Sequence, residues 1–392
     1  MLATNRINLN TRYRNTSPIS LFIFPLSHGV NHLFQLILPA VLPSVTAELK
    51  LSYYSAGILA ACFAVSYAAL QVPIGYVSDR FGRRNIMVLG GLVYSVAIIA
   101  SGFSTDFSQL AVAQVFAGIG GSSFHPVGLP LFSQLVDRQR LGRAMGFVQM
   151  GGAVGSLLSP LAAVFIASIF GWRYSFILLS PVGFITALLA WLYVKEPDPQ
   201  VKLQQEKSGR VDYVLAALVT LFALLWLFGF RGVTAFLTLF AVKKFQVDLG
   251  YAAFLLSMLQ VAGIFSGPLF GHLSDRFGRR GVLVMTVLLQ GLLVYTLAFA
   301  SLEALPLILV VFGCLAYGSI AVTDATVTSM DWGRALGTVF GFYITASFLS
   351  SAIVPPVMGY LVDTVSFEFA FGIIAIPTLL AVPLILLVLR KR

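Results

Sequence analysis

The sequence is poor in charged side chains, because Asp, Glu, Lys and Arg together make up only 10% of its 392 residues. A soluble domain carries about 25% of these residues, so the low share excludes an ordinary soluble protein. Hydrophobic residues make up 58% of the chain and the mean hydropathy is +0.91. The apolar excess extends over the whole length, which predicts a protein that crosses a membrane many times.

Several features of other protein classes are also missing. The chain has two cysteines, Cys62 and Cys314, and both lie in apolar stretches, so we expect neither a disulfide nor a metal site built on cysteine. No G-x-x-x-x-G-K-[ST] loop points to ATP, and no nucleophile elbow sets a serine beside a histidine. The longest hydrophilic interior stretch, 195–210, is too short for a soluble catalytic domain. We therefore expect no cofactor, no metal and no enzymatic activity.

Apolar runs long enough to span a bilayer, about 20 residues each, occur twelve times. Their bounds are 19–45, 53–77, 85–103, 108–135, 142–168, 173–194, 211–241, 249–273, 281–300, 304–329, 335–361 and 368–389. The predicted fold class is an all-α membrane protein with twelve transmembrane helices. The predicted domains are a tail 1–18, a six-helix bundle 19–194, a linker 195–210, a second bundle 211–389 and a tail 390–392.

The positive charges predict the orientation of the chain. With the N-terminus inside, 20 of the 25 Lys and Arg residues fall in cytoplasmic segments, as the excess of basic residues in cytoplasmic loops requires. This bias also explains the net charge of +10 without any nucleic-acid partner. We expect a multi-pass protein of the inner or plasma membrane with both termini in the cytoplasm.

A charged stretch of ten residues occurs twice, half a chain apart. The first copy is Gly75-Tyr76-Val77-Ser78-Asp79-Arg80-Phe81-Gly82-Arg83-Arg84. The second copy is Gly271-His272-Leu273-Ser274-Asp275-Arg276-Phe277-Gly278-Arg279-Arg280. Eight of the ten positions are identical, which indicates two equivalent halves. Two matching bundles of helices with a site between them are typical of secondary transporters.

Ionisable side chains are rare inside the predicted spans, and each is therefore informative. They are His28 and His32 in the first span, His125 in the fourth, Arg231 in the seventh and Asp324 in the tenth. A charge at the bilayer centre costs at least about 2.5–3.5 kcal/mol, so such groups usually face a wet cavity. Asp324 lies close to a helix end and can instead be interfacial. A direct pair between Arg231 and Asp324 is not predicted, because their depths differ by well over about 10 Å.

Helical spacing extends these positions into polar faces. The candidate cavity residues on them are His28, Asn31, His32, Gln35, Gln114, Ser122, His125, Arg231, Thr234, Thr238 and Asp324. A polar stripe in a membrane can instead hold helices together, and both interpretations stay open for the asparagine and the glutamines. The candidates for proton coupling are His28, His32, His125 and Asp324, since histidine titrates near neutral pH. A neutral imidazole that bonds a serine or a carbonyl is the alternative.

The repeated stretch resembles the signature loop of the major facilitator superfamily, which follows the second and the eighth helix. The resemblance covers the whole chain and implies two six-helix bundles that rock about a central cavity lined by helices one, four, seven and ten. In the loops, Gly75 and Gly271 remove side chains where two helices approach closely. Asp79 and Asp275 are carboxylates at a helix end that can touch the other half in only one conformation. We therefore predict that the loops act as a conformational latch. The latch residues are Gly75, Asp79, Arg80, Gly82, Arg83, Arg84, Gly271, Asp275, Arg276, Gly278, Arg279 and Arg280. Alternatively, the arginines only fix the topology.

Two shorter segments are similar to the fosmidomycin-resistance exporters. They are Ser27-His28-Gly29-Val30-Asn31 and Phe124-His125-Pro126-Val127-Gly128. The chain departs from the drug-exporter pattern at Gln114, where an arginine is common, and at Pro160, which follows Ser159 rather than a glycine. These two departures from the drug-exporter pattern count against antiport without excluding it.

The resulting hypothesis is a secondary active transporter that works by alternating access, coupled to protons, and exports an amphipathic or anionic compound. The alternatives are proton-coupled uptake of an organic anion or sugar, a sensor that binds without transporting, and a membrane-embedded enzyme acting on lipid. The expected partners are a small-molecule substrate, protons and the lipid bilayer, and a monomer is expected.

Overall fold

The computed structural model describes residues 18–136, 140–196, 212–330, 332 and 336–389, and the elements found in them are helical. The first half contains α2 (Pro18–Glu48), α3 (Tyr53–Phe81), α4 (Arg83–Gly102), α5 (Phe107–Gly121), η2 (Phe124–Gly128), α6 (Leu129–Leu135), α7 (Leu141–Phe170) and α8 (Trp172–Tyr193). The second half contains α9 (Tyr213–Phe245), α10 (Leu249–Val261), α11 (Gly263–Phe277), α12 (Arg279–Leu297), α13 (Leu305–Ser329), α14 (Leu336–Thr364) and α15 (Phe367–Val388).

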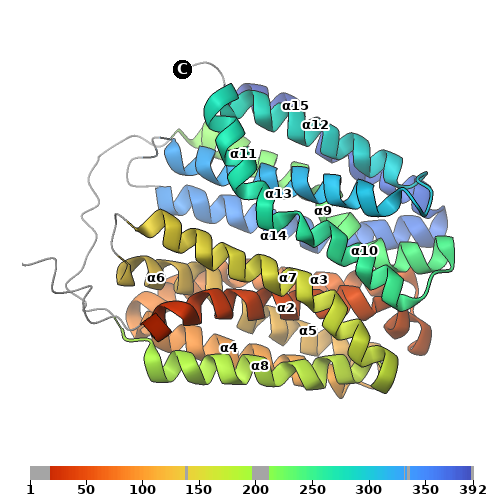
Figure 1. Ribbon diagram of the computed structural model, residues 1–392, viewed down its shortest axis with the longest axis horizontal. Helices are drawn as coiled ribbons and strands as arrows, with labels where there is room; N and C mark the ends of the chain where they lie inside the picture. Colours follow the sequence, from red (N-terminus) through yellow and green to blue (C-terminus); the bar gives the residue numbers. More distant parts are fainter. Residues whose placement is uncertain (1–17, 137–139, 197–211, 331, 333–335, 390–392) are drawn as a thin grey trace, which may run out of the picture.

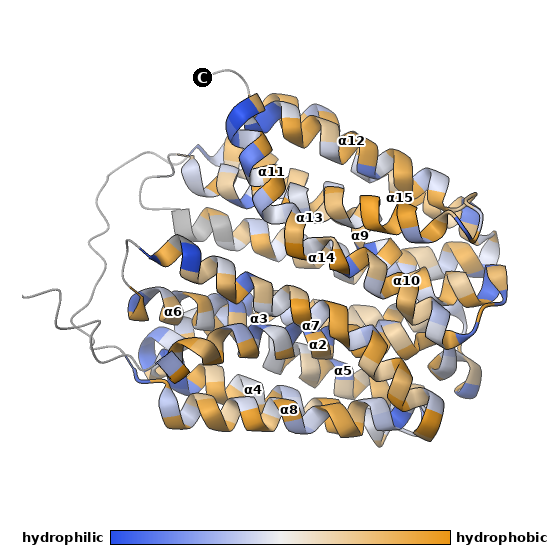
Figure 2. Cartoon of the chain, viewed as in Figure 1, coloured by the Kyte–Doolittle hydropathy of each residue, from blue (hydrophilic) through white to orange (hydrophobic). Residues whose placement is uncertain are grey.

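The helices run side by side along the long axis of the molecule, with α2 to α8 in one group and α9 to α15 in another (Figure 1). Hydrophobic residues cover the lengths of the helices, and hydrophilic residues gather near their ends, most clearly where α11 meets α12 (Figure 2). This distribution is that of a bundle whose middle lies in lipid. The all-helical membrane fold with two bundles is thus as the sequence predicts.

Eleven helices in the described ranges are long and apolar enough to cross a membrane. The remaining predicted span, the fourth (108–135), is instead broken into α5, the π-helical turn η2 and α6. Pro126 lies in this turn and has no backbone N–H to donate. The hydroxyls of Ser122 and Ser123 donate to the carbonyls of Ile119 and Gly120, at 2.7 and 2.9 Å. These bonds offer the backbone an alternative to the regular helix ladder.

The two halves contact each other through α3 with α14, α7 with α10, and α2 with α9. We call the end of the bundle with Asp79–Arg84 and Asp275–Arg280 the motif end, and the opposite end, with Glu48 and Phe367, the far end. Near the far end, Asp363 of α14 accepts hydrogen bonds from the backbone N–H groups of Tyr53 and Tyr54, at 3.0 and 2.7 Å. The N-terminus of α3 is therefore capped by a carboxylate of the other half.

The halves are in closest contact on the far-end side of the bundle. A Cβ on Gly57 of α3 would lie 2.3 Å from the Pro355 carbonyl oxygen of α14, and one on Gly359 would lie 2.2 Å from the Tyr53 carbonyl oxygen. Nearer the motif end, a Cβ on Gly146 or Gly341 would meet nothing within 4 Å. At these four described positions, the chain is closely packed on the far-end side and open nearer the motif end.

The repeated loops use glycine for its backbone conformation. Gly82 ends α3 with φ +90° and Gly278 ends α11 with φ +85°, a region that other residues avoid. A Cβ on Gly75 would touch only the Pro126 Cβ, at 3.6 Å, and one on Gly271 would touch nothing within 4 Å. The close helix approach that motivates Gly75 and Gly271 in the sequence is therefore not made in this arrangement.

Parts of the predicted domains lie outside the described residues: 1–17 of the first tail, 197–210 of the linker, and the tail 390–392.

The contact at Gly57 gives a stability test. Gly57→Ala forces α3 and α14 apart, and we expect it to destabilise this arrangement by about 1–3 kcal/mol, as overpacking does. Gly146→Ala is the matched control, since its Cβ meets open space and alanine is the better helix former by about 1 kcal/mol. Thermal unfolding of both variants checks this. A Gly57→Ala midpoint at or above that of Gly146→Ala contradicts the packing described here.

Candidate functional site

Three of the chain's four histidines meet in the first half of the structure. The His28 and His32 side chains lie one turn apart on α2, with 3.1 Å between their Nε2 atoms. His125 comes from η2, and its ring centroid lies 5.3 Å from that of His28 and 6.2 Å from that of His32. One nitrogen of each ring lies within 4.8 Å of those of the others. We call these three residues the histidine cluster.

The rings of His28 and His125 are each oriented by a hydrogen bond at Nδ1. His28 Nδ1 lies 2.9 Å from the Val148 carbonyl oxygen of α7. Because a carbonyl only accepts, His28 Nδ1 carries the proton and donates it. His125 Nδ1 lies 2.6 Å from the Tyr67 hydroxyl of α3. The cluster is thus held by three helices besides α2: η2, α3 and α7.

Aromatic rings link the histidine cluster to the second half. The Tyr67 ring stacks on Phe348 of α14, with 4.2 Å between centroids. Phe348 also makes an edge contact with His125, at 6.2 Å. A movement of α14 relative to α3 therefore changes the surroundings of His125 directly.

Arg231 of α9 also lies close to Phe348. Its guanidinium carbon is 5.5 Å from the centroid of the Phe348 ring and 5.7 Å from that of Phe230, within cation–π range. Its Nε is buried without a hydrogen-bond partner, and within the described ranges no carboxylate pairs with it. The guanidinium is within electrostatic range of His32 and of the Tyr67 hydroxyl. An uncompensated cation thus faces the histidine cluster across the boundary between the halves.

Asp324 of α13 lies apart from Arg231 and binds a different partner. Its Oδ1 accepts a hydrogen bond of 2.7 Å from the hydroxyl of Tyr343 on α14. The ion pairs found among the described residues are elsewhere, so Asp324 and Arg231 form none with each other there. Asp324 is half-buried and lies five residues before the end of α13 at Ser329.

The remaining polar candidates are distributed over several contacts. Asn31 donates to the Gly121 carbonyl at 2.8 Å, and Gln114 donates to the Ser101 hydroxyl of α4 at 3.1 Å. These two side chains therefore join helices within the first half. Ser122 bonds a carbonyl of its own helix. Gln35 is half-buried, with no hydrogen bond to any described residue.

The two threonines of α9 differ from each other. Thr238 donates a 2.6 Å bond to the Pro39 carbonyl of α2 and so joins the two halves. The Thr234 hydroxyl is buried without a partner, one turn beyond Arg231. Arg231 and Thr234 thus present unsatisfied polar atoms on the same helix face.

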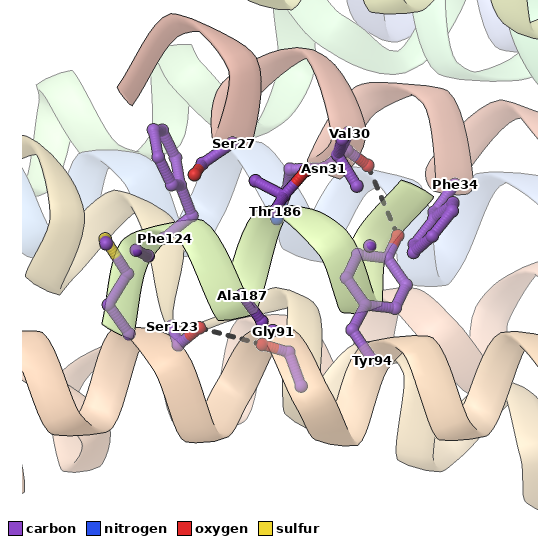
Figure 3. A pocket seen from close by; sticks show the side chains of 14 residues that line it. Ser27, Val30, Asn31, Phe34, Gly91, Tyr94, Ser123, Phe124, Thr186 and Ala187 are labelled. Carbon is purple, nitrogen blue, oxygen red and sulfur yellow. Dashed lines mark hydrogen bonds between the residues drawn. The ribbon is translucent and has the colours of Figure 1, made fainter. Parts of the chain in front are cut away.

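A small cavity lies inside the first half, between α2, α4, α8 and η2 (Figure 3). Its volume is about 50 Å³, and Asn31 and Tyr94 line it. The Tyr94 hydroxyl donates to the Asn31 carbonyl oxygen at 3.3 Å. Sites for small molecules usually measure about 300–1,000 Å³, so this space suits a water molecule rather than a substrate.

Four aromatic residues near the site are absent from the candidates predicted from the sequence. Tyr67 and Phe348 bridge the halves, Tyr343 binds Asp324, and the Tyr317 hydroxyl donates to Gln260 at 2.6 Å. With 14 tyrosines and 33 phenylalanines in the chain, most apolar runs contain one. The sequence therefore held no signal that separates these rings from rings that face lipid.

The first repeated loop is tied down within its own half. Asp79 pairs with Arg83 at 2.8 Å, one helical turn apart. Glu196, which follows α8, accepts from the backbone N–H groups of Arg83 and Arg84, at 2.7 Å each, and so caps α4. In the second loop, Arg279 donates to the hydroxyl of Ser329 at the end of α13.

Two helical bundles around buried polar groups are the arrangement of many secondary transporters. The family model of the major facilitator superfamily matches residues 26–353. The chain belongs to this superfamily, and it is a secondary transporter of that class.

Curated relatives match nearly the full chain at low identity. A probable sulfoacetate transporter, SauU, of Cupriavidus necator is 25% identical, over 91% of this chain and 90% of that protein. The cis,cis-muconate transport protein of Acinetobacter baylyi is 26% identical, over 86% and 85%. The fosmidomycin resistance protein of Escherichia coli is 24% identical, over 91% and 89%.

A solved structure confirms the fold. The bacterial homologue of the human lysosomal transporter Spinster, in an inward-facing and occupied conformation, superposes with a TM-score of 0.80 at 18% identity. The match covers 95% of this chain and 96% of that one.

The role of the Asp79 charge in the first repeated loop can be tested separately from the roles of the histidine cluster and Arg231. Asp79→Asn removes the pair with Arg83, and we expect it to reduce transport while expression and membrane insertion stay unchanged. The control is Glu303→Gln, which neutralises an exposed carboxylate in the loop at the opposite end. Transport by Asp79→Asn equal to that of the control would leave the loop with a topological role only.

Proposed function

We propose that this chain is a proton-coupled transporter that exports an amphipathic or anionic compound by alternating access. The inference of an anionic substrate rests on one observation, the surroundings of the Arg231 side chain. A half-buried arginine whose Nε is buried without a partner, and with no carboxylate paired to it in the described ranges, is unusual, because a charge near the bilayer centre costs at least about 2.5–3.5 kcal/mol. A substrate carboxylate, sulfonate or phosphonate supplies the missing counter-charge, and the planar guanidinium suits bidentate binding of such groups.

The surroundings of Arg231 suit an organic anion with an apolar part. Phe230 and Phe348 flank the guanidinium, and the buried hydroxyl of Thr234 lies on the same helix face. Two relatives carry names of organic anions, sulfoacetate and cis,cis-muconate. These names support a substrate of the same chemical class here, without identifying it.

The histidine cluster is our candidate for proton exchange. His28 Nδ1 donates to a carbonyl, so its Nε2 holds a lone pair and accepts from His32 Nε2. A proton taken up at His28 Nε2 removes this bond, whereas one taken up at His32 Nδ1 leaves it in place, and either proton adds a positive charge on the side of the first half. Protonation and the arrival of an anion at Arg231 are therefore linked electrostatically. Asp324, bonded to Tyr343, is the further candidate on the second half.

The orientation predicted from the basic residues places the motif end in the cytoplasm. The closed far end is then the outer end, and the arrangement is inward-facing. In this proposal the protein belongs to the inner or plasma membrane. The repeated loops act as the latch that alternates with the contacts of Asp363 and Gly57.

Proton-coupled uptake of an organic anion is the second candidate, favoured by the relatives named for sulfoacetate and cis,cis-muconate. Export is favoured by the relative named for fosmidomycin resistance. Both use the same site, so only direction separates them. Resistance of cells that express the chain supports export, and growth on the compound as a carbon source supports uptake.

Arg231 gives the test of the substrate class. A thermal-shift screen of purified protein with sulfoacetate, cis,cis-muconate and fosmidomycin, at two pH values, selects the ligand. We expect Arg231→Gln to weaken binding of that anion at least about tenfold, because a hydrogen bond to a charged group contributes about 1.5–3 kcal/mol. Lys243→Gln, an exposed charge on the same helix, is the control. Equal binding by both variants would exclude Arg231 as the anion site.

The histidines give the test of coupling. In proteoliposomes with an imposed pH gradient, we expect His28→Ala and His125→Ala to lose gradient-driven transport and to retain counterflow, which needs no proton movement. His272→Ala, the exposed fourth histidine, should behave as wild type. If both cluster variants keep full gradient-driven transport, the histidines do not carry the protons.

A further inference from the structure

The histidine cluster has the composition of a metal site. Three of the four histidines in the chain bring one ring nitrogen each within 4.8 Å of the others. His28 is buried, and His32 and His125 are half-buried. The sequence predicts no metal because its histidines and cysteines do not have metal-ligand spacing along the chain. In the structure, η2 brings His125 to the two histidines of α2. Among the described histidines, cysteines and carboxylates, these three histidines have side chains close enough together to hold a metal ion.

The second nitrogens of two rings are bound as they are in metal proteins. A metal-bound histidine usually donates its other N–H to a carbonyl or a similar group, which fixes the ring and its tautomer. His28 Nδ1 donates to the Val148 carbonyl, which leaves Nε2 free to bind. His125 Nδ1 is held by the Tyr67 hydroxyl at 2.6 Å, which leaves Nε2 of that ring free of the tyrosine.

The distances fit a small divalent ion. A tetrahedral zinc with Zn–N bonds of about 2.0–2.1 Å keeps its nitrogens about 3.3 Å apart. The Nε2 atoms of His28 and His32 are 3.1 Å apart. The hydrogen bond between these two Nε2 atoms contains one hydrogen. A metal ion that replaces this hydrogen can bind both nitrogens with little movement of α2. Only the third nitrogen, on His125, has to approach, and it already lies within 4.8 Å of the other two.

The donor set selects the type of metal. Imidazole suits zinc, copper and nickel, whereas calcium and magnesium prefer oxygen ligands. Three histidines with a fourth position open form the pattern of an accessible zinc site rather than a structural one. The groups that face the cluster are Tyr67 of α3 and Arg231 of α9. The positive charge of Arg231 favours hydroxide or another anion at the fourth position.

We propose that His28, His32 and His125 bind one Zn²⁺ ion and that this ion inhibits transport by occupying the nitrogens that exchange protons. The inhibition rests on the proton-coupled function proposed above, whereas the binding does not. All three ligands belong to the first half, so zinc can bind without joining the two halves. Zinc and protons compete for the same lone pairs, so binding weakens as the pH falls.

Binding is tested on the purified full chain without a polyhistidine tag. Titration calorimetry with Zn²⁺ at about pH 7.5 should give one ion per chain, and at about pH 5.5 much weaker binding, since histidine titrates between these values. Co²⁺ should give the visible absorption of a four-coordinate site. His32→Ala and His125→Ala should each weaken binding at least about tenfold, and His272→Ala should leave it unchanged.

His32→Ala is expected to fold, since the hydrogen bond of this ring is to His28 alone among the described residues; size-exclusion chromatography checks this, and His125→Gln is the second variant. Absence of zinc binding by wild type, or binding that survives both ligand substitutions, overturns the site. Binding at one ion per chain with undiminished gradient-driven transport overturns the inhibition. A chain that binds zinc but transports no anion refutes the proposed function and leaves the metal site standing.

Discussion

The inability of lipid to solvate charge is the constraint on which the rest of the structure depends. Each ionisable side chain in a span must face protein, because the hydrocarbon offers it neither water nor counter-ions. Arg231 makes cation–π contacts with the rings of Phe230 and Phe348, and His28 donates a hydrogen bond to the Val148 carbonyl. The same constraint acts on the backbone at Pro126, where the serine hydroxyls and the packing of η2 replace a regular helix turn. The polar groups therefore mark the inner face of each helix.

The sequence predicts the fold well because the span length and the basic loops are local signals. It also predicts that His28 and His32 are neighbours, since they are four residues apart on one helix. It could not predict that His125 joins them, because a helical wheel assumes an unbroken helix. Gln114 shares the wheel face of His125, yet it binds Ser101 of α4, since the π turn η2 rotates the residues that follow it. Tyr67 and Phe348 carry no periodic signal at all.

The two halves contribute different chemistry to the site. The first half supplies the three histidines, which can be neutral, and the second supplies Arg231 and Asp324. A ligand shifts a conformational equilibrium only through contacts that differ between the states. Here the Tyr67–Phe348 stack lies between the two sets of groups, so the distance between histidines and guanidinium changes when the halves rock. In the proposed mechanism, the three histidines and Arg231 lie on different halves, and their electrostatic coupling therefore depends on conformation.

The same reasoning limits how strongly the far end can be closed. Alternation requires two states within a few kcal/mol of each other, so the closing contacts must be replaceable. Asp363 is exposed, and the N–H groups of Tyr53 and Tyr54 that it binds can be taken over by water when the halves part. Each such exchange costs no more than about 1.5–3 kcal/mol, the contribution of a hydrogen bond to a charged group. The glycines at 57 and 359 add close packing that is lost without exposing a large side chain. In the proposed mechanism, a closure made of a shared cap and small residues is specific in geometry and weak in energy, and it therefore suits a reversible gate.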